Sequence, residues 1–237
     1  MFHRWIIKTF IWFFKVDFKE AEKDLADYPN LREFFIRKLK SGARPISTAM
    51  VVHPCDSKVQ QASEILISEG LHDLKLIQAK GKFYSLPQLS QDAEAFQKWS
   101  GGYFITYYLH PRDYHWVHAP LSGKVLAVKH ISGKLWPVNT LAIRTISNLY
   151  LQNARVFIEL ATEYGPVGVC LVGAYNVGRI SILAEVGANL QKGDPLGYFN
   201  FGSTVVVIYP KKFYDQNKTN LRFHEPIRMG SGLTQEQ

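Results

Sequence analysis

The chain has 237 residues, of which 46% are hydrophobic and 20% charged, and its formal net charge is +8. This composition excludes a long disordered chain, and the two cysteines, Cys55 and Cys170, exclude a disulfide-rich fold. The positive charge favours an anionic partner, such as a membrane surface, an acidic substrate or a nucleic acid, without choosing among them.

The first sixteen residues are mostly apolar and aromatic, with basic residues and no acidic one. Their uncharged runs are too short to cross a bilayer or to act as a secretion signal. On a helix, Arg4, Lys8 and Lys15 fall on one narrow stripe. The wide remaining face consists of Phe2, Trp5, Ile6, Phe10, Trp12 and Phe13. We therefore expect a helix that lies in the membrane interface; the alternative is a helix packed on the protein's own core or on a second subunit.

Further helix-like segments follow in the first hundred residues. Residues 17–26 are charged and helix-prone, and Asn30 is the expected N-cap of a helix that runs to residue 39. A third helix is predicted over 87–99, where two consecutive glycines close it.

From residue 103 onward, short runs rich in Val, Ile, Tyr and Phe are separated by Gly, Pro, Asn and Asp. This spacing predicts an antiparallel sandwich or barrel and not alternating strands and helices. The expected strands are 104–109, 123–131, 141–146, 155–162, 167–174, 179–184 and 203–209. The predicted fold class is α+β: a single domain with an antiparallel β-sandwich or barrel-like core and N-terminal membrane-docking helices. We expect residues 1–45 to form the helical region and residues 46–237 to form the β-rich catalytic domain.

The segment 108–120 holds the densest cluster of reactive side chains. Its members are His110, Arg112, Asp113, His115 and His118. Because histidine exchanges protons near neutral pH, this cluster indicates acid–base chemistry. His115 and His118, with His53 or Cys55, could instead supply zinc ligands, but the chain offers no second closely spaced pair, which disfavours a metal site.

Two other positions could take part in chemistry. Asp56 lies in the turn-like segment HPCDSKV, where a lone aspartate commonly caps backbone amides. Ser203 follows Gly202 and precedes a β-branched strand, so its hydroxyl lies next to an uncrowded glycine carbonyl. Asp56, His118 and Ser203 could form a nucleophilic triad, although these residues alone do not show that they meet.

Seven segments together carry a resemblance to a known family. They are FFIRKLKSGARPI at 34–46, HPCDSKV at 53–59, QAKGKFYSL at 78–86, YLHPRDYHWVHAP at 108–120, LWPVN at 135–139, YGPVGVCLVGA at 164–174 and KGDPLGYFNFGSTVVV at 192–207. The RDYH-x-VH pattern and the Gly-Ser-Thr before a hydrophobic strand are the most specific. With these segments in this order, the chain resembles the bacterial phosphatidylserine decarboxylase family over nearly its full length.

The resemblance implies a self-processing enzyme. Asp56, His118 and Ser203 match the family's Asp-His-Ser triad, and His115 matches a histidine that we place beside the substrate. It implies cleavage between Gly202 and Ser203, which turns Ser203 into a covalent pyruvoyl cofactor. Through a Schiff base, this cofactor would convert phosphatidylserine to phosphatidylethanolamine in phospholipid biosynthesis. No metal is implied.

The resemblance also implies partners and a location. The β chain, residues 1–202, and the α chain, residues 203–237, would stay associated, and the enzyme would form a homodimer. Together with the basic, aromatic N-terminal helix, it implies a peripheral protein on an anionic membrane surface, at the cytoplasmic face of the inner membrane.

A few positions depart from the family pattern. Ser57, Trp116, Ala154 and Phe201 stand where the family more often has Gly, Arg, Glu and Leu. None of these changes removes a member of the triad, so we expect activity to be retained. The changes instead put the lipid preference in doubt.

Three alternative functions stay open. A pyruvoyl-dependent decarboxylase of a soluble amino acid would have no use for an aromatic interfacial helix. A non-catalytic membrane-binding homologue would not need the set Asp56, His118 and Ser203. A nucleic-acid-binding role is the least favoured, because the basic residues are dispersed and lack a motif of stacking aromatic residues.

Overall fold

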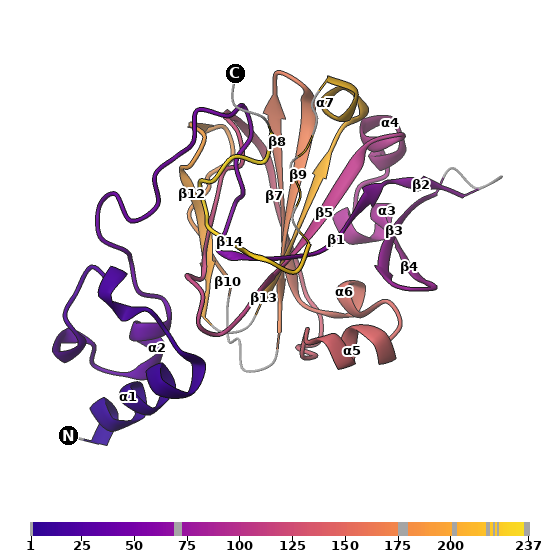
Figure 1. Ribbon diagram of the computed structural model, residues 1–237. Helices are drawn as coiled ribbons and strands as arrows, with labels where there is room; N and C mark the ends of the chain where they lie inside the picture. The colour runs from indigo at the N-terminus through magenta and orange to yellow at the C-terminus, as the bar shows by residue number, and fades with distance from the viewer. Residues whose placement is uncertain are drawn as a thin grey trace.

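The computed structural model describes residues 2–68, 73–174, 180–200, 203–216, 219, 221 and 223–234. Its strands form three antiparallel sheets (Figure 1). The large sheet has the order β11-β7-β8-β9-β13-β5-β1-β14, and the two smaller sheets are β10-β12-β6 and β2-β3-β4.

The large sheet contains β1 (Ser57–Glu64), β5 (Tyr103–Leu109), β7 (Gly123–Ile131), β8 (Arg155–Thr162), β9 (Gly165–Gly173), β11 (Asn189–Leu190), β13 (Ser203–Tyr209) and β14 (Pro226–Ile227). The smaller sheets contain β2 (Leu66–Ile67), β3 (Leu74–Ala79), β4 (Lys82–Ser85), β6 (Trp116–His118), β10 (Ile180–Ile182) and β12 (Pro195–Phe199).

Both faces of the large sheet are covered. One face packs against the sheet β10-β12-β6, and this interlayer core includes Val117, Leu196, Val205 and Val207. The other face packs against helices, and that core includes Trp99, Leu149, Val206 and Ile208. Because side chains alternate along a strand, β13 has to be apolar at nearly every position. This explains the uninterrupted Val-Val-Val-Ile run in the sequence.

The helices fall into two groups (Figure 1). Those on the sheets are α3 (Leu86–Ser90), α4 (Ala95–Trp99), α5 (Thr140–Thr145), α6 (Leu149–Gln152) and α7 (Lys211–Gln216). The N-terminal group comprises α1 (Phe2–Phe14), α2 (Leu31–Phe35) and two short 3-10 turns, Phe18–Glu20 and Leu25–Asp27. This group, at the lower left of Figure 1, has an aromatic core of its own that includes Ile7, Phe10, Phe34 and Phe35.

The α+β class and the antiparallel core are confirmed, with sandwich-like layers in the described part of the chain and not a closed barrel. The predicted strands at 104–109, 123–131, 155–162, 167–174 and 203–209 correspond to β5, β7, β8, β9 and β13. The strand expected over 179–184 is the shorter β10, and residue 179 lies outside the described residues. The sequence missed β1 to β4, which form before residue 103. The division of the chain at residue 45 stays a prediction.

The predicted strand at 141–146 is wrong, because this segment is the helix α5. The Asn139 side chain caps the helix by accepting a hydrogen bond from the Ala142 amide at 2.9 Å. At the other end, the Gln78 side chain donates hydrogen bonds to the carbonyls of Ile143 and Ile146, at 2.8 and 2.6 Å. Gln78 belongs to β3, so a distant strand satisfies the helix end.

Two predicted helices are shorter than expected. The segment 87–99 forms two helices, because Gln91 takes a left-handed conformation with φ of 48° and ends the first. The helix that begins after Asn30 stops at Phe35, and the following residues pair with 20–22 instead, through hydrogen bonds from Glu22 N to Lys38 O and from Lys40 N to Glu20 O. The segment 17–26 contains only short 3-10 turns.

α1 forms where the amphipathic pattern predicts it, but one of its aromatic residues faces the protein. Phe10 is 7% exposed and packs on Phe34 and Phe35. Trp5, Trp12 and Phe13 remain 64%, 78% and 67% exposed. No helix in the described ranges is long and apolar enough to span a bilayer.

We predict that the interlayer core dominates the stability of the fold. Leu171 on β9 is fully buried in it, and truncation to alanine should lower the free energy of unfolding by about 2–5 kcal/mol. The matched control is Leu141→Ala on α5, where the side chain is 71% exposed and the loss should stay below about 0.5 kcal/mol. Urea unfolding measures both values. Equal losses would contradict this assignment of the core.

Candidate active site

Asp56 lies in a buried turn immediately before β1. Its Oδ1 accepts hydrogen bonds from Arg44 Nε and from the Met229 amide, both at 2.8 Å. Arg44 also contacts the second carboxylate oxygen and reaches Glu20 at 2.8 Å. Burial works against the charged guanidinium, but the hydrogen bonds to Asp56 and Glu20 outweigh it and raise the pKa of Arg44. Arg44 is therefore the direct partner that holds Asp56 in place.

His118 is the last residue of β6 and is almost fully buried. Its Nδ1 lies 2.7 Å from the carbonyl oxygen of Gly193, so Nδ1–H donates to that carbonyl and the other nitrogen carries the lone pair. Nε2 lies 3.2 Å from the hydroxyl of Tyr114. Burial lowers the pKa of His118, against the opposing effects of the Gly193 hydrogen bond and the Asp56 charge. The ring is therefore neutral and can accept a proton at Nε2.

Ser203 is the first residue of β13 and is fully buried. Within the described part of the chain, its Oγ has no hydrogen-bond partner. Its side chain leaves the strand on the same face as Val205, toward the interlayer core. A buried hydroxyl without a partner is unusual in a folded protein, and such groups concentrate where function requires them. Gly202, the other predicted cleavage residue, and Phe201 lie outside the described residues.

His115 is the second histidine of this segment and is fully buried. Nδ1 donates to the carbonyl oxygen of Asp113 at 2.8 Å, and Nε2 has no partner among the described residues. Burial lowers the pKa of His115 to about 3, so the ring is neutral. The Phe35 ring of α2 packs against it at a centroid distance of 4.0 Å.

The structure brings the predicted residues together in two groups. Asp56 lines a cavity of about 240 Å³ and His118 lines one of about 300 Å³, and the two cavities share Leu39, Arg44 and Tyr114. No described hydrogen bond joins Asp56 to His118, so the Asp56 charge acts on the ring through space.

Ser203 and His115, the second group, are related through the backbone, and no side-chain contact between them is found among the described residues. His115 is opposite the last residue of β12, since its carbonyl accepts a hydrogen bond from the Phe199 amide at 3.0 Å. Ser203 begins the next strand, β13. Both residues therefore lie at the connection between the small and the large sheet. No described contact joins Ser203 to His118, and the catalytic roles of all four residues remain predictions.

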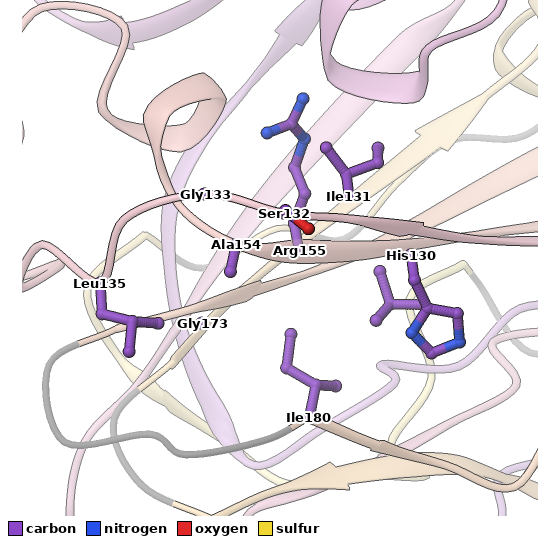
Figure 2. Close-up of a pocket in the computed structure, with 10 residues that line it drawn as sticks. His130, Ile131, Ser132, Gly133, Leu135, Ala154, Arg155, Gly173 and Ile180 are labelled. Carbon is purple, nitrogen blue, oxygen red and sulfur yellow. The ribbon is translucent and has the colours of Figure 1, made fainter.

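A further cavity of about 440 Å³ lies beside Gly173, the residue that pairs with Ser203 across β9 and β13. Figure 2 shows its lining, which includes Leu135, Ile180 and His130. The guanidinium of Arg155 points away from Ile180 in this view and donates to main-chain carbonyls. This mainly apolar cavity offers space next to the strand that begins with Ser203, but few groups for catalysis.

Sequence reasoning assigned no role to Arg44 and Tyr114 in this region, and it placed Asp113 in the reactive cluster without foreseeing its burial. Arg44 lies in the ARPI segment and Tyr114 in RDYH, so both were within recognised motifs but had no assigned role. Asp113 is buried, and burial raises its pKa to about 6 although the His110 amide donates a hydrogen bond to it. Only their positions in the fold reveal these roles.

Taken together, the fold and the site define an α+β enzyme equipped for nucleophilic and proton-transfer chemistry. A buried serine hydroxyl begins a central strand, and burial keeps two histidines of the 110–118 segment neutral. Among the described residues, no group of three or more His, Cys, Asp or Glu side chains could hold a metal ion.

Comparison with known proteins identifies the family. Residues 31–235 match the family model described as phosphatidylserine decarboxylase. A relative from Actinobacillus pleuropneumoniae, named phosphatidylserine decarboxylase proenzyme, is 36% identical over 96% of this chain and 83% of its own length. Proenzymes of the same name from a Shewanella species and from Pseudoalteromonas translucida are 35% and 36% identical, over 96% and 86% of this chain and 84% and 77% of their own lengths. The chain belongs to the phosphatidylserine decarboxylase family, and it is a decarboxylase.

We predict that acid destabilises the chain through its buried neutral histidines. Unfolding returns the pKa of His115 from about 3 to 6.5, so the unfolded chain binds more protons and stability falls as the pH drops through this window. When the pH falls from 7 to 5, the unfolding free energy of the unchanged chain should therefore drop by about 2 kcal/mol more than that of the His115→Gln variant. Urea unfolding at several pH values measures this difference.

His130→Gln is the matched control, because His130 is exposed. It should leave the pH dependence of stability unchanged. If His115→Gln also leaves it unchanged, His115 is not the buried neutral group that the structure indicates.

Proposed function

We propose that this chain is a pyruvoyl-dependent phosphatidylserine decarboxylase that cuts itself between Gly202 and Ser203. The observation that carries the proposal is the Ser203 hydroxyl, which is buried at the start of β13 without a partner in the described structure. The relatives, which are named phosphatidylserine decarboxylase proenzymes, support both the substrate and the processing.

The proposed cleavage converts an amide into an ester. Ser203 Oγ attacks the Gly202 carbonyl carbon and loses its proton to a base, while the C–N bond breaks and the freed nitrogen is protonated. Elimination then releases the carboxylate of residue 202 and leaves a dehydroalanine at position 203. Addition of water and loss of ammonia give the pyruvoyl group at the start of the α chain. A buried hydroxyl is suited to this attack, because no hydrogen bond from the described residues competes for it.

His118 is the proposed base. Its lowered pKa keeps Nε2 unprotonated, and the Gly193 carbonyl fixes the required tautomer. The Tyr114 hydroxyl now lies against Nε2 and would have to release it before His118 could accept the Ser203 proton. We assign His115 to the substrate side of the reaction, because its Nε2 is unprotonated and has no described partner.

Ser203 fits the proposed cofactor because the cofactor derives from that residue. When formed, a pyruvoyl group supplies an electron sink for the pair left by departing carbon dioxide. The surrounding protein contributes a dry environment, which favours loss of a charged carboxylate as a neutral gas. Asp56, held by Arg44, supplies a fixed negative charge near His118 that stabilises its protonated form.

The mass of the purified chain tests self-processing. We expect two fragments that separate after residue 202, and the smaller should be one ammonia lighter than its serine-started sequence. Ser203→Ala should remain a single species of 27.1 kDa. A single species of that mass from the unchanged chain would contradict self-cleavage.

The same experiment separates the two histidines. His118→Ala should abolish cleavage, whereas His115→Ala should still be cleaved but release carbon dioxide from phosphatidylserine at least about 100-fold more slowly. The reverse pattern would exchange their roles.

We also propose that the enzyme is peripheral, on the cytoplasmic face of the inner membrane. The exposed aromatic residues Trp5, Trp12 and Phe13 on α1 support the peripheral location, because such side chains favour the interface of a bilayer. The choice of membrane and face rests on the family resemblance. Phe10 does not contribute, since it packs on α2. The homodimer that the family resemblance implies stays a prediction.

Flotation with vesicles that contain phosphatidylserine tests membrane binding. A chain with Trp5→Ser, Trp12→Ser and Phe13→Ser should bind at least about ten-fold more weakly, because each substitution removes apolar surface that would enter the bilayer. Val186→Ser is the control, since Val186 is 65% exposed on the loop between β10 and β11. Equal flotation of the two variants would argue against docking through α1.

A further inference from the structure

A cavity of about 620 Å³ on the helix-covered face of the large sheet is lined by an unbalanced set of charges. It lies between β1, β3, β5 and α5. Its basic lining residues are Lys58, Lys80, His110, Arg112, Arg144 and His224. Among the described lining residues there is no aspartate or glutamate. We call it the cationic cavity.

Two other cations of the described structure, Arg44 and Lys98, are paired with acids. Arg44 contacts Asp56 and Glu20, and Lys98 contacts Asp92 and Glu159. In the cationic cavity, Arg112 Nε lies 3.6 Å from Asp113 Oδ1, whereas the side chains of Lys58, Lys80 and Arg144 form no hydrogen bond or ion pair with the described residues. These three side chains can therefore donate hydrogen bonds to a bound anion.

The electrostatic effect of this lining is visible at His110. Burial lowers the pKa of His110, and the positive charges of Arg112 and Lys58 lower it further. Neutral donors are also present: Thr140 lines the cavity, and so does Tyr108, whose pKa is raised by burial so that its phenol keeps its proton. Arginine, lysine and hydroxyl donors that converge on one space suit the oxygens of a phosphate group.

The cavity shares Arg112 with the cavity that Asp56 lines, but it lies on the face of the large sheet opposite to the Ser203 side chain. Tyr108 is directly opposite Thr204 in the pairing of β5 with β13, so its side chain leaves the sheet on the face opposite to Ser203. A phosphate bound beside Tyr108 would lie across the sheet from the Ser203 side chain. It would belong to a molecule other than the one that reacts.

The position of the cavity indicates where that phosphate comes from. The ring of Phe14, at the end of α1, packs on His110 with a centroid distance of 5.9 Å. On the other side, α5 carries Arg144 in the lining and Leu141 71% exposed. In Figure 1, α1 and α5 lie toward the same lower end of the β-layers. A bilayer that meets this end would bring lipid headgroups to the cavity.

We propose that the cationic cavity binds the phosphate group of an anionic phospholipid that is not the substrate molecule, and so anchors the docked enzyme. The choice of a lipid headgroup over free phosphate rests on the proposed function, whereas the affinity for phosphate does not.

Titration of the full chain with inorganic phosphate, followed by calorimetry, tests the site. The double variant Lys58→Gln, Arg144→Gln should bind phosphate at least about ten-fold more weakly, because it loses two charged donors. The control Lys75→Gln, Lys124→Gln also removes two positive charges from strands but none from the cavity lining. It should bind as the unchanged chain does, and all three chains should unfold at the same temperature. No phosphate binding, or equal binding by both variants, would overturn the site.

Vesicles of phosphatidylglycerol distinguish the two sources of phosphate, because this lipid has the phosphodiester but no amine that could react. The cavity variant should float with these vesicles several-fold less than the control variant of equal net charge. If it loses phosphate binding but floats equally well, the lipid assignment is overturned and the site serves free phosphate. Intact mass in the same samples reports self-cleavage separately, so a failure of this site and a failure of the proposed function remain distinguishable.

Discussion

The central constraint of this structure is the pairing of β13 with strands on both of its sides. Antiparallel hydrogen bonds join it to β5 and to β9, and every one of its residues is buried. Because buried backbone groups have to be paired, these two ladders fix the register of β13 and with it the position of Ser203. A chain break immediately before Ser203, and the loss of the nitrogen of residue 203, leave the pairing of residues 204–209 intact. The two fragments would therefore remain one folded unit after cleavage.

The segment from 110 to 118 connects this sheet to the small one, and it also receives the N-terminal helices. Phe14 packs on His110, Phe35 packs on His115, and the Trp116 indole donates to the Ile36 carbonyl at 3.0 Å. The N-terminal helices therefore contact this segment directly, α1 at His110 and α2 at His115. The two buried histidines also differ in their surroundings. The Phe35 ring packs against His115, whereas His118 lines a cavity.

Positive side chains are paired with carboxylates near Asp56, whereas several in the cationic cavity have no acidic partner among the described residues. Near Asp56, cations and carboxylates alternate, so that Arg44 is held between two acids. Such a balanced cluster is rigid and holds a fixed charge near His118. The cationic cavity lacks acids in its described lining, so its potential is available to a ligand.

The sequence by itself determined the strands of the second half, because burial on both faces of a sheet demands a continuous apolar run such as Val205 to Ile208. It also determined the amphipathic α1 and the segments that hold Asp56, His118 and Ser203. It could not determine that 141–146 is a helix, since Gln78 from a distant strand satisfies the last carbonyls of that helix. Nor could it show that Arg44 holds Asp56, that Gly193 fixes the His118 tautomer, or that Phe10 faces α2. Each of these depends on which elements become neighbours, and only the burial and backbone pairing of the complete fold decide that.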